Sequence, residues 1–162
     1  MVQKYLERAS LPGAVLLASV PPQGLLTASL NLALLKPQLF SALNGLLFEG
    51  RASLEVLRET LFAGPVALDR LTRYYGLMQP ESPRAIWDMT FFDLPQRWRM
   101  SVPPLLVLGA ERDLMVPPQQ VVQCAQAYDV DADIFPATGH AMMLESGWKR
   151  VAERIIDWLR AL

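Results

Sequence analysis

The sequence has few of the residues on which disulfides, metal sites and nucleic-acid contacts depend. Its 162 residues include one cysteine and one histidine, and the formal net charge is −1. The single cysteine, Cys124, excludes an internal disulfide and is compatible with a reducing compartment, so we expect a cytoplasmic protein in which Cys124 is a small buried residue. One histidine and one cysteine argue against a metal site, and no motif indicates another cofactor. The basic residues are scattered, which leaves no electrostatic case for binding nucleic acid or an anionic membrane.

Long apolar runs are also missing, although 52% of the residues are hydrophobic and only 19% are charged. The first residues, MVQKYLERAS, lack the apolar segment of a signal peptide. The most apolar stretch, GLLTASLNLALL, is too short and too interrupted to span a bilayer. The composition predicts one folded domain with a sizeable core and no membrane span.

Both ends of the chain have the pattern of a parallel α/β sheet. A helix over residues 1–9 precedes an apolar run over residues 14–20 that suits a strand buried on both faces. Strands that alternate with helices predict parallel pairing through right-handed crossovers. In the second half we expect, in order, a strand over residues 105–108, a helix that begins at Pro117 or Pro118, a short strand that ends near Phe135, and an amphipathic helix over residues 146–162 whose stripe holds Trp148, Val151, Ile155, Trp158, Leu159 and Leu162.

Residues 25–98 show no strand pattern and consist of short helical stretches divided by glycine and proline. Gly64 and Gly76 fall where glycines end helices, and Pro65 and Pro83 fall where a first-turn proline is tolerated. This segment therefore reads as a helical insertion. It divides the chain into residues 1–24, which open the sheet, the insertion over residues 25–98, and residues 99–162, which complete the sheet.

Two residues with the chemistry of a catalytic pair follow two of the predicted strands. Asp113 follows LLVLG, and His140 follows DIF in FPATGH. Loops beyond the carboxyl ends of adjacent parallel strands lie together, and a carboxylate beside an imidazole fixes its tautomer and stabilises the imidazolium. Taken singly, His140 is also typical of a turn, and Asp113 of a carboxylate at a helix N-terminus. Their paired placement favours an acid and a base of one site.

The segments PPLLVLGAERDLMVPP and DIFPATGHAMMLESGWKRVAERIIDWL resemble the C-terminal part of α/β-hydrolases of the esterase and lysophospholipase type. That family has Asp-x-x-Val-Pro in the loop of its triad acid and Gly-His before its last helix. The resemblance implies an α/β-hydrolase fold in which Asp113 is the acid and His140 the base of a serine triad. It also implies that residues 14–20 form the sixth strand and that residues 25–98 form a helical lid, and it suggests small apolar esters as substrates.

The family's nucleophile motif, Gly-x-Ser-x-Gly, does not occur in residues 1–162. Ser19 is the nearest substitute because it ends a strand, but no sharp turn surrounds it. By resemblance, MVQKYLER is the helix that follows the nucleophile, so we expect a truncated chain that is inactive alone. The alternatives are a non-catalytic interaction module and one half of a hydrolase that a second chain completes. The strand over residues 14–20 would then have an unpaired edge, for which we expect self-association.

The helical insertion is rich in large apolar residues, which either pack the insertion itself or line an acyl pocket. Trp87, Phe91 and Phe92 leave the same two interpretations open. Met142 and Met143, next to His140, either contact substrate or fill the core behind the base. The apolar residues of the first helical stretches are Leu25, Leu26, Leu30, Leu34, Leu35, Phe40, Leu43, Leu46, Leu47 and Phe48.

Overall fold

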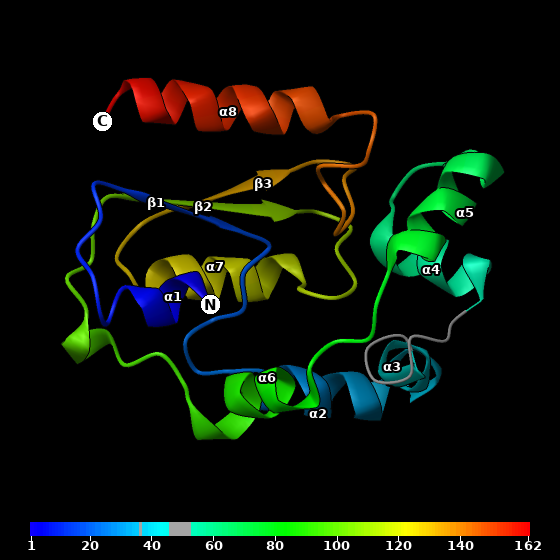
Figure 1. The fold of residues 1–162 in the computed structure, drawn as a ribbon, viewed down its shortest axis with the longest axis horizontal. Coiled ribbons are helices and arrows are strands. Elements are labelled where there is room, and N and C mark those ends of the chain that lie inside the picture. Colours follow the sequence, from blue (N-terminus) through cyan, green and yellow to red (C-terminus); the bar gives the residue numbers. More distant parts are fainter. Residues whose placement is uncertain (36, 46–52) are drawn as a thin grey trace.

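A sheet of three parallel strands forms the centre of the molecule (Figure 1). This confirms the parallel sheet expected from the alternation of strands and helices. The computed structural model describes residues 1–35, 37–45 and 53–162. In the order in which they lie side by side, the strands are β1 (Ala14–Leu17), β2 (Leu105–Ala110) and β3 (Ala132–Phe135).

β1 is shorter than the apolar run that predicts it. It ends at Leu17 because Ala18, with a φ of 45°, leaves the extended conformation that the prediction carried on to Val20. The N–H of Ala18 still donates to the carbonyl of Leu108 at 2.9 Å, so the turn starts while the chain is in contact with β2. The chain thus leaves the sheet at the edge where β2 and β3 also end.

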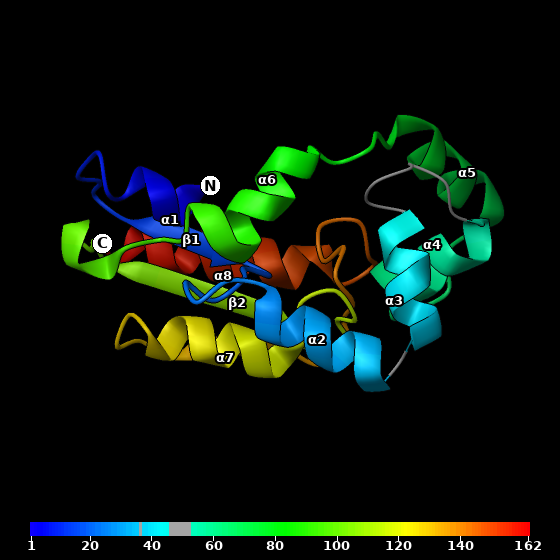
Figure 2. The same ribbon diagram turned by 90° about the horizontal axis from the view of Figure 1, so that it is seen from below.

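Helices cover both faces of the sheet (Figures 1 and 2). The helix α7 (Pro118–Gln126) lies on one face together with α1 (Val2–Tyr5), which is shorter than the helix expected over residues 1–9. The helix α8 (Trp148–Arg160) lies on the other face. Side chains of a strand alternate between the two faces of its sheet. Leu105 and Val107 of β2 therefore pack with α7, and Leu106 and Leu108 pack with α8.

The apolar stripe of α8 is only partly covered. Val151 is buried against β2, and Ile155 and Trp158 pack onto the same cluster. The predicted apolar stripe is therefore covered by the sheet in its middle and open towards its two ends. Trp148, Leu159 and Leu162 remain about half exposed.

The described residues between β1 and β2 form helices and loops only. The helices α4 and α5 lie beyond the carboxyl ends of β2 and β3, and α2 and α6 lie below α7 in Figure 1. None of the described helices has the length and apolar character needed to cross a membrane. The helices of this region are α2 (Leu26–Leu35), α3 (Pro37–Asn44), α4 (Leu54–Leu61), α5 (Leu68–Leu77), α6 (Pro83–Trp87), a π-helix η2 (Asp88–Phe92) and a 3-10 helix η3 (Arg97–Arg99).

Side-chain hydrogen bonds cap the N-termini of two of these helices, whereas glycines do not end the helices at their C-termini. The Ser82 hydroxyl accepts a hydrogen bond from Ala85 N at 3.3 Å, and Pro83 occupies the first turn of α6, as predicted. The glycine assignments are wrong. Helix α4 ends before Gly64, and Gly76 lies inside the last turn of α5. Pro65 lies in the loop before α5 and not in its first turn.

Candidate active site

The carboxylate of Asp113 organises the loop that follows β2. Its Oδ1 accepts hydrogen bonds from the backbone N–H groups of Met115 and Val116, both at 2.8 Å. This arrangement closes a turn directly before α7 and leaves the Asp113 side chain with no exposed surface. Asp113 therefore does have the structural role that the sequence also allowed, that of a carboxylate just before a helix. It occupies only one of the two carboxylate oxygens.

The second oxygen of the same carboxylate holds the imidazole of His140. Oδ2 of Asp113 lies 2.9 Å from Nδ1 of His140. Because a carboxylate only accepts hydrogen bonds, Nδ1 carries the proton and Nε2 of the neutral ring is left as the acceptor. The ring is 28% exposed, whereas its partner is fully buried. The structure thus brings together the two residues that the sequence pairs.

Backbone hydrogen bonds join the loops that carry these two side chains. Glu111 N donates to the carbonyl of Phe135 at 3.0 Å, and Arg112 N donates to the carbonyl of Thr138 at 2.9 Å. The Glu111 carboxylate in turn accepts from Ala137 N at 2.7 Å, where Ala137 has a φ of 53°. A non-glycine residue in the left-handed region costs about 1–3 kcal/mol, which these bonds offset. The distance between Asp113 and His140 is thereby set by the backbone as well as by the side chains.

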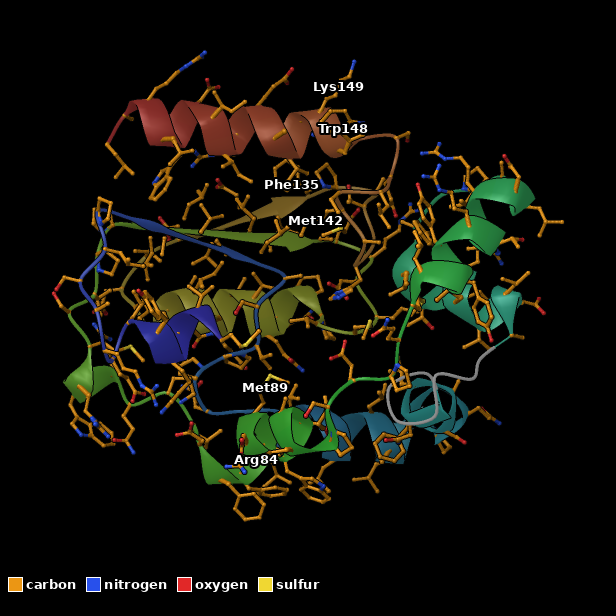
Figure 3. All side chains as sticks on the ribbon, in the orientation of Figure 1. Arg84, Met89, Phe135, Met142, Trp148 and Lys149 are labelled. Carbon is orange, nitrogen blue, oxygen red and sulfur yellow. The ribbon has the colours of Figure 1, made fainter. Side chains whose placement is uncertain are left out.

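A cavity of about 360 Å³ lies beside His140. One wall is the loop before α7, including Met115 and Val116, and the opposite wall comes from the helical region. Figure 3 shows Met89 on the side of η2 that faces α7. Most of the lining is apolar, and its polar members include Gln120, whose Oε1 is buried and accepts no hydrogen bond from the described residues. The apolar lining from the helical region is Leu25, Leu32, Phe40, Leu43, Ile86 and Met89.

The apolar residues of the first helical stretches therefore divide between several environments. Leu25, Phe40 and Leu43 line the cavity. Leu30 and Leu34 are more than half exposed and are not among the residues that line this cavity. Leu26 is also exposed, at 39%. Leu46, Leu47 and Phe48, like the side chain of Leu35, lie outside the described residues.

The aromatic residues of α6 and η2 are not among the residues that line this cavity. The rings of Trp87 and Phe91 stack with their centroids 5.8 Å apart, and Phe92 packs beside both. All three are exposed, so they do not pack in the core, and Trp87 and Phe92 line a separate open hollow with Arg84 and Asp88. Beside His140, Met142 is fully buried between β2 and α8, as expected of a core residue, and Figure 3 shows it in that layer. Met143 is 56% exposed, which contradicts its assignment to the core.

Ser19, the nearest substitute for a nucleophile, is engaged elsewhere. Its hydroxyl accepts a hydrogen bond from Nε2 of Gln3 at 2.9 Å, and Ser19 is not among the described residues that line the cavity. Nε2 of Gln3 also lies 3.7 Å from the sulfur of Cys124. Burial raises the pKa of the Cys124 thiol to about 11, so this cysteine is a protonated core residue at neutral pH, as expected.

No group of three His, Cys, Asp or Glu side chains that could bind a metal ion forms within the part of the chain that the structure describes. The paired carboxylate and imidazole of Asp113 and His140 lie beside a mostly apolar cavity. Sequence reasoning missed Glu111 and Glu145, which hold the two loops. Neither belongs to a spacing pattern, although GHAMMLE places a carboxylate within one short loop of His140.

Comparison with known proteins agrees with this geometry. The family model described as the alpha/beta hydrolase family matches residues 3–154. No curated protein gives a significant match. Among solved structures, the fold is similar to that of an esterase from Exiguobacterium antarcticum, with a TM-score of 0.67 and 14% sequence identity, over 98% of this chain and 62% of the esterase. At that identity the likeness shows the fold alone, and the chain spans less than two thirds of the esterase.

Proposed function

Because this chain belongs to the alpha/beta hydrolase family, we propose that Asp113 and His140 are the acid and base of a serine triad that cleaves carboxylic esters with apolar acyl groups. The observation that carries the proposal is the 2.9 Å contact between Asp113 Oδ2 and His140 Nδ1. It leaves Nε2 as the acceptor that a general base needs. The similar solved structure is that of an esterase, which agrees with this reaction.

The chemistry assigns a separate task to each residue. His140 Nε2 takes the proton of the attacking hydroxyl and later returns it to the leaving alcohol. Asp113 keeps the ring in the Nδ1–H tautomer and stabilises the imidazolium between these two steps. The apolar cavity beside His140 receives the acyl group, with the helical region over residues 25–98 as its lid. In this proposal the lid walls come from α2, α3 and η2.

The serine and the oxyanion hole of this reaction are assigned to polypeptide other than residues 1–162, because no Gly-x-Ser-x-Gly occurs among them. The 162-residue chain alone is then expected to be inactive. Loss of triad members costs several orders of magnitude in rate. The test is treatment of the purified chain with a fluorophosphonate, followed by mass spectrometry of the intact protein. No adduct is expected, and stoichiometric modification would refute the assignment.

The positive test supplies the missing serine. The chain is assayed for hydrolysis of p-nitrophenyl esters together with a polypeptide that carries the nucleophile, placed either ahead of residue 1 or on a separate chain. Activity is expected to fall by about 10³-fold or more in His140→Ala. It should be unchanged in Lys149→Ala, an exposed residue on α8. Hydrolysis that survives His140→Ala would contradict the proposal.

One observation favours the reading in which a second polypeptide completes the enzyme. Within the described residues, β1 pairs only with β2, so its other edge has free backbone N–H and C=O groups. A parallel strand from another chain or another segment would satisfy them. A purely non-catalytic interaction module is less well supported, because it has no use for the hydrogen-bonded pair of Asp113 and His140. A cytoplasmic location remains a prediction from the single cysteine.

A further inference from the structure

The loop that carries His140 is fastened to the C-terminal end of α4. Ala141 N donates to the carbonyl of Leu61 at 2.8 Å. Oε1 of Glu145 accepts from Ala63 N at 2.6 Å and from Gly139 N at 3.0 Å. Both neighbours of His140 in the sequence are thus bound to the short stretch 61–63 at the end of α4, one directly and one through Glu145. Figures 1 and 2 show this loop and α4 side by side.

The approach is so close that only glycine fits at position 139. A Cβ there would lie 2.7 Å from Ala63 N and 2.8 Å from Leu61 O. Both are backbone atoms, which cannot rotate away as the end of a side chain can. The contact is therefore a backbone-to-backbone junction between two segments that lie far apart in the sequence.

Apolar packing also stabilises the junction between α4 and the His140 loop. A buried cluster joins Ala141 of the His140 loop to Leu57 of α4, to Phe62 directly after α4 and to Leu71 of α5. The carbonyl of Leu61 is one of the last groups of α4, which have no partner inside the helix. The His140 loop supplies that partner, and it has no strand or helix of its own to hold it in place. Each segment therefore fixes the other.

We propose that the helix pair α4–α5 is the positioning element for His140 and that Glu145 is the positioning residue through which it acts. Without the Glu145 carboxylate, the Gly139 and Ala63 N–H groups lose their common acceptor and the loop separates from α4. The imidazole then leaves its 2.9 Å contact with Asp113, because the ring moves with the loop. The importance of this positioning for catalysis rests on the proposed role of His140 as base. Its effect on the position of the ring does not depend on that role.

The presence of a single histidine makes this inference measurable without any enzyme assay. In the ¹⁵N-labelled 162-residue chain, all imidazole NMR signals come from His140. A proton on Nδ1 that is bonded to a buried carboxylate gives a low-field signal in slow exchange with water. In Glu145→Ala we expect this proton to exchange roughly 10-fold faster or more, as loss of a charge-assisted hydrogen bond predicts, or its signal to disappear. Glu145→Gln keeps an acceptor oxygen and should restore the wild-type signal.

Matched controls separate positioning from general destabilisation. Glu153→Ala removes an exposed glutamate on α8 and should leave the signal unchanged. Gly139→Ala should abolish it, whereas Gly147→Ala should not, since a Cβ at Gly147 meets nothing within 4 Å. Wild-type exchange in Glu145→Ala would overturn the inference.

A further variant decides the question if Glu145→Ala does not fold. Leu71→Ala loosens the packing of α4 on α5 without touching the loop. Faster exchange at His140 in that variant supports the inference, and wild-type exchange overturns it. Failure of the proposed function would appear differently, as an absence of ester hydrolysis in the completed enzyme while these NMR results stand.

Discussion

Replacing Asp113 by asparagine is expected to reverse the tautomer of His140 while leaving the surrounding loop in place. The reason is that the two carboxylate oxygens accept hydrogen bonds from different groups. Oδ1 accepts from the N–H groups of Met115 and Val116 at 2.8 Å, so the carbonyl oxygen of the asparagine must take that position. Its NH₂ group then faces Nδ1 of His140. An amide NH₂ only donates, so Nδ1 becomes the acceptor and the proton moves to Nε2.

The size of the shift in tautomer ratio follows from the hydrogen bond between Asp113 and His140 that is lost. The wild-type contact, 2.9 Å between Nδ1 and a carboxylate with no exposed surface, is a hydrogen bond to a charged group. Such bonds contribute about 1.5–3 kcal/mol. At about 1.4 kcal/mol per factor of ten, its loss shifts the tautomer ratio by roughly 10- to 100-fold. In a completed enzyme the reversed tautomer has no acceptor for the nucleophile's proton, and the rate should fall by about 10⁴-fold.

Long-range ¹H–¹⁵N correlation spectra of the imidazole distinguish the two tautomers directly. The wild type should show the proton on Nδ1 and Asp113→Asn should show it on Nε2. Asp133→Asn is the control, because Asp133 pairs with Arg154 at 2.6 Å on the partly exposed side of β3 and should have no effect. If Asp113→Asn keeps the Nδ1–H pattern in a folded chain, the argument from the two oxygens is wrong.

Four other outcomes are expected. Gly109→Ala should destabilise the chain by about 1–3 kcal/mol in urea unfolding, because its Cβ would lie 2.8 Å from a β3 side chain and 2.9 Å from one on α7, whereas Gly147→Ala should have little effect. Cys124 should react with Ellman's reagent only after denaturation, given its burial and a pKa of about 11. Burial raises the pKa of Glu7, but its hydrogen bonds to Lys4 and to the Gln96 N–H, together with the charges of Lys4 and Arg99, lower it by more, so the pKa lies below its ordinary value of 4.5. The stability from these contacts is present above pH 4.5 and is lost as pH falls through the lowered value, and this pH dependence should weaken in Lys4→Met. Finally, light scattering should show self-association of the isolated chain through the free edge of β1, and a monodisperse monomer would count against it.

The pairing of Asp113 with His140 was predictable because it depends on strand order alone. Each residue directly follows a strand, and adjacent parallel strands place such positions at one edge of the sheet. The pattern also predicts β2 well, since a buried central strand is a continuous apolar run, and it places the end of the partly buried edge strand β3 at Phe135. It could not place the end of β1, where a turn at Ala18 interrupts an apolar run that continues in the sequence.

The junction between α4 and the His140 loop has no counterpart in the sequence pattern. It joins Ala63 to Glu145, which are 82 positions apart, through a backbone N–H that every residue except proline has. The exposed ends of α8 escaped prediction for a related reason. Periodicity shows which side chains share a face, but the length of the sheet beneath decides which of them are covered.

The two sets of contacts that hold His140 also limit how the helical region can move as a lid. A rigid movement of the whole region would break the bonds of Leu61 and Ala63 to the His140 loop and expose the buried cluster around Leu57. It would therefore displace His140, the proposed base, each time the cavity opened. The cavity walls on α2, α3 and η2 have no such bond to that loop among the described contacts. If residues 25–98 form a lid, we expect these elements to open and close over the cavity while α4 and α5 stay in place with His140.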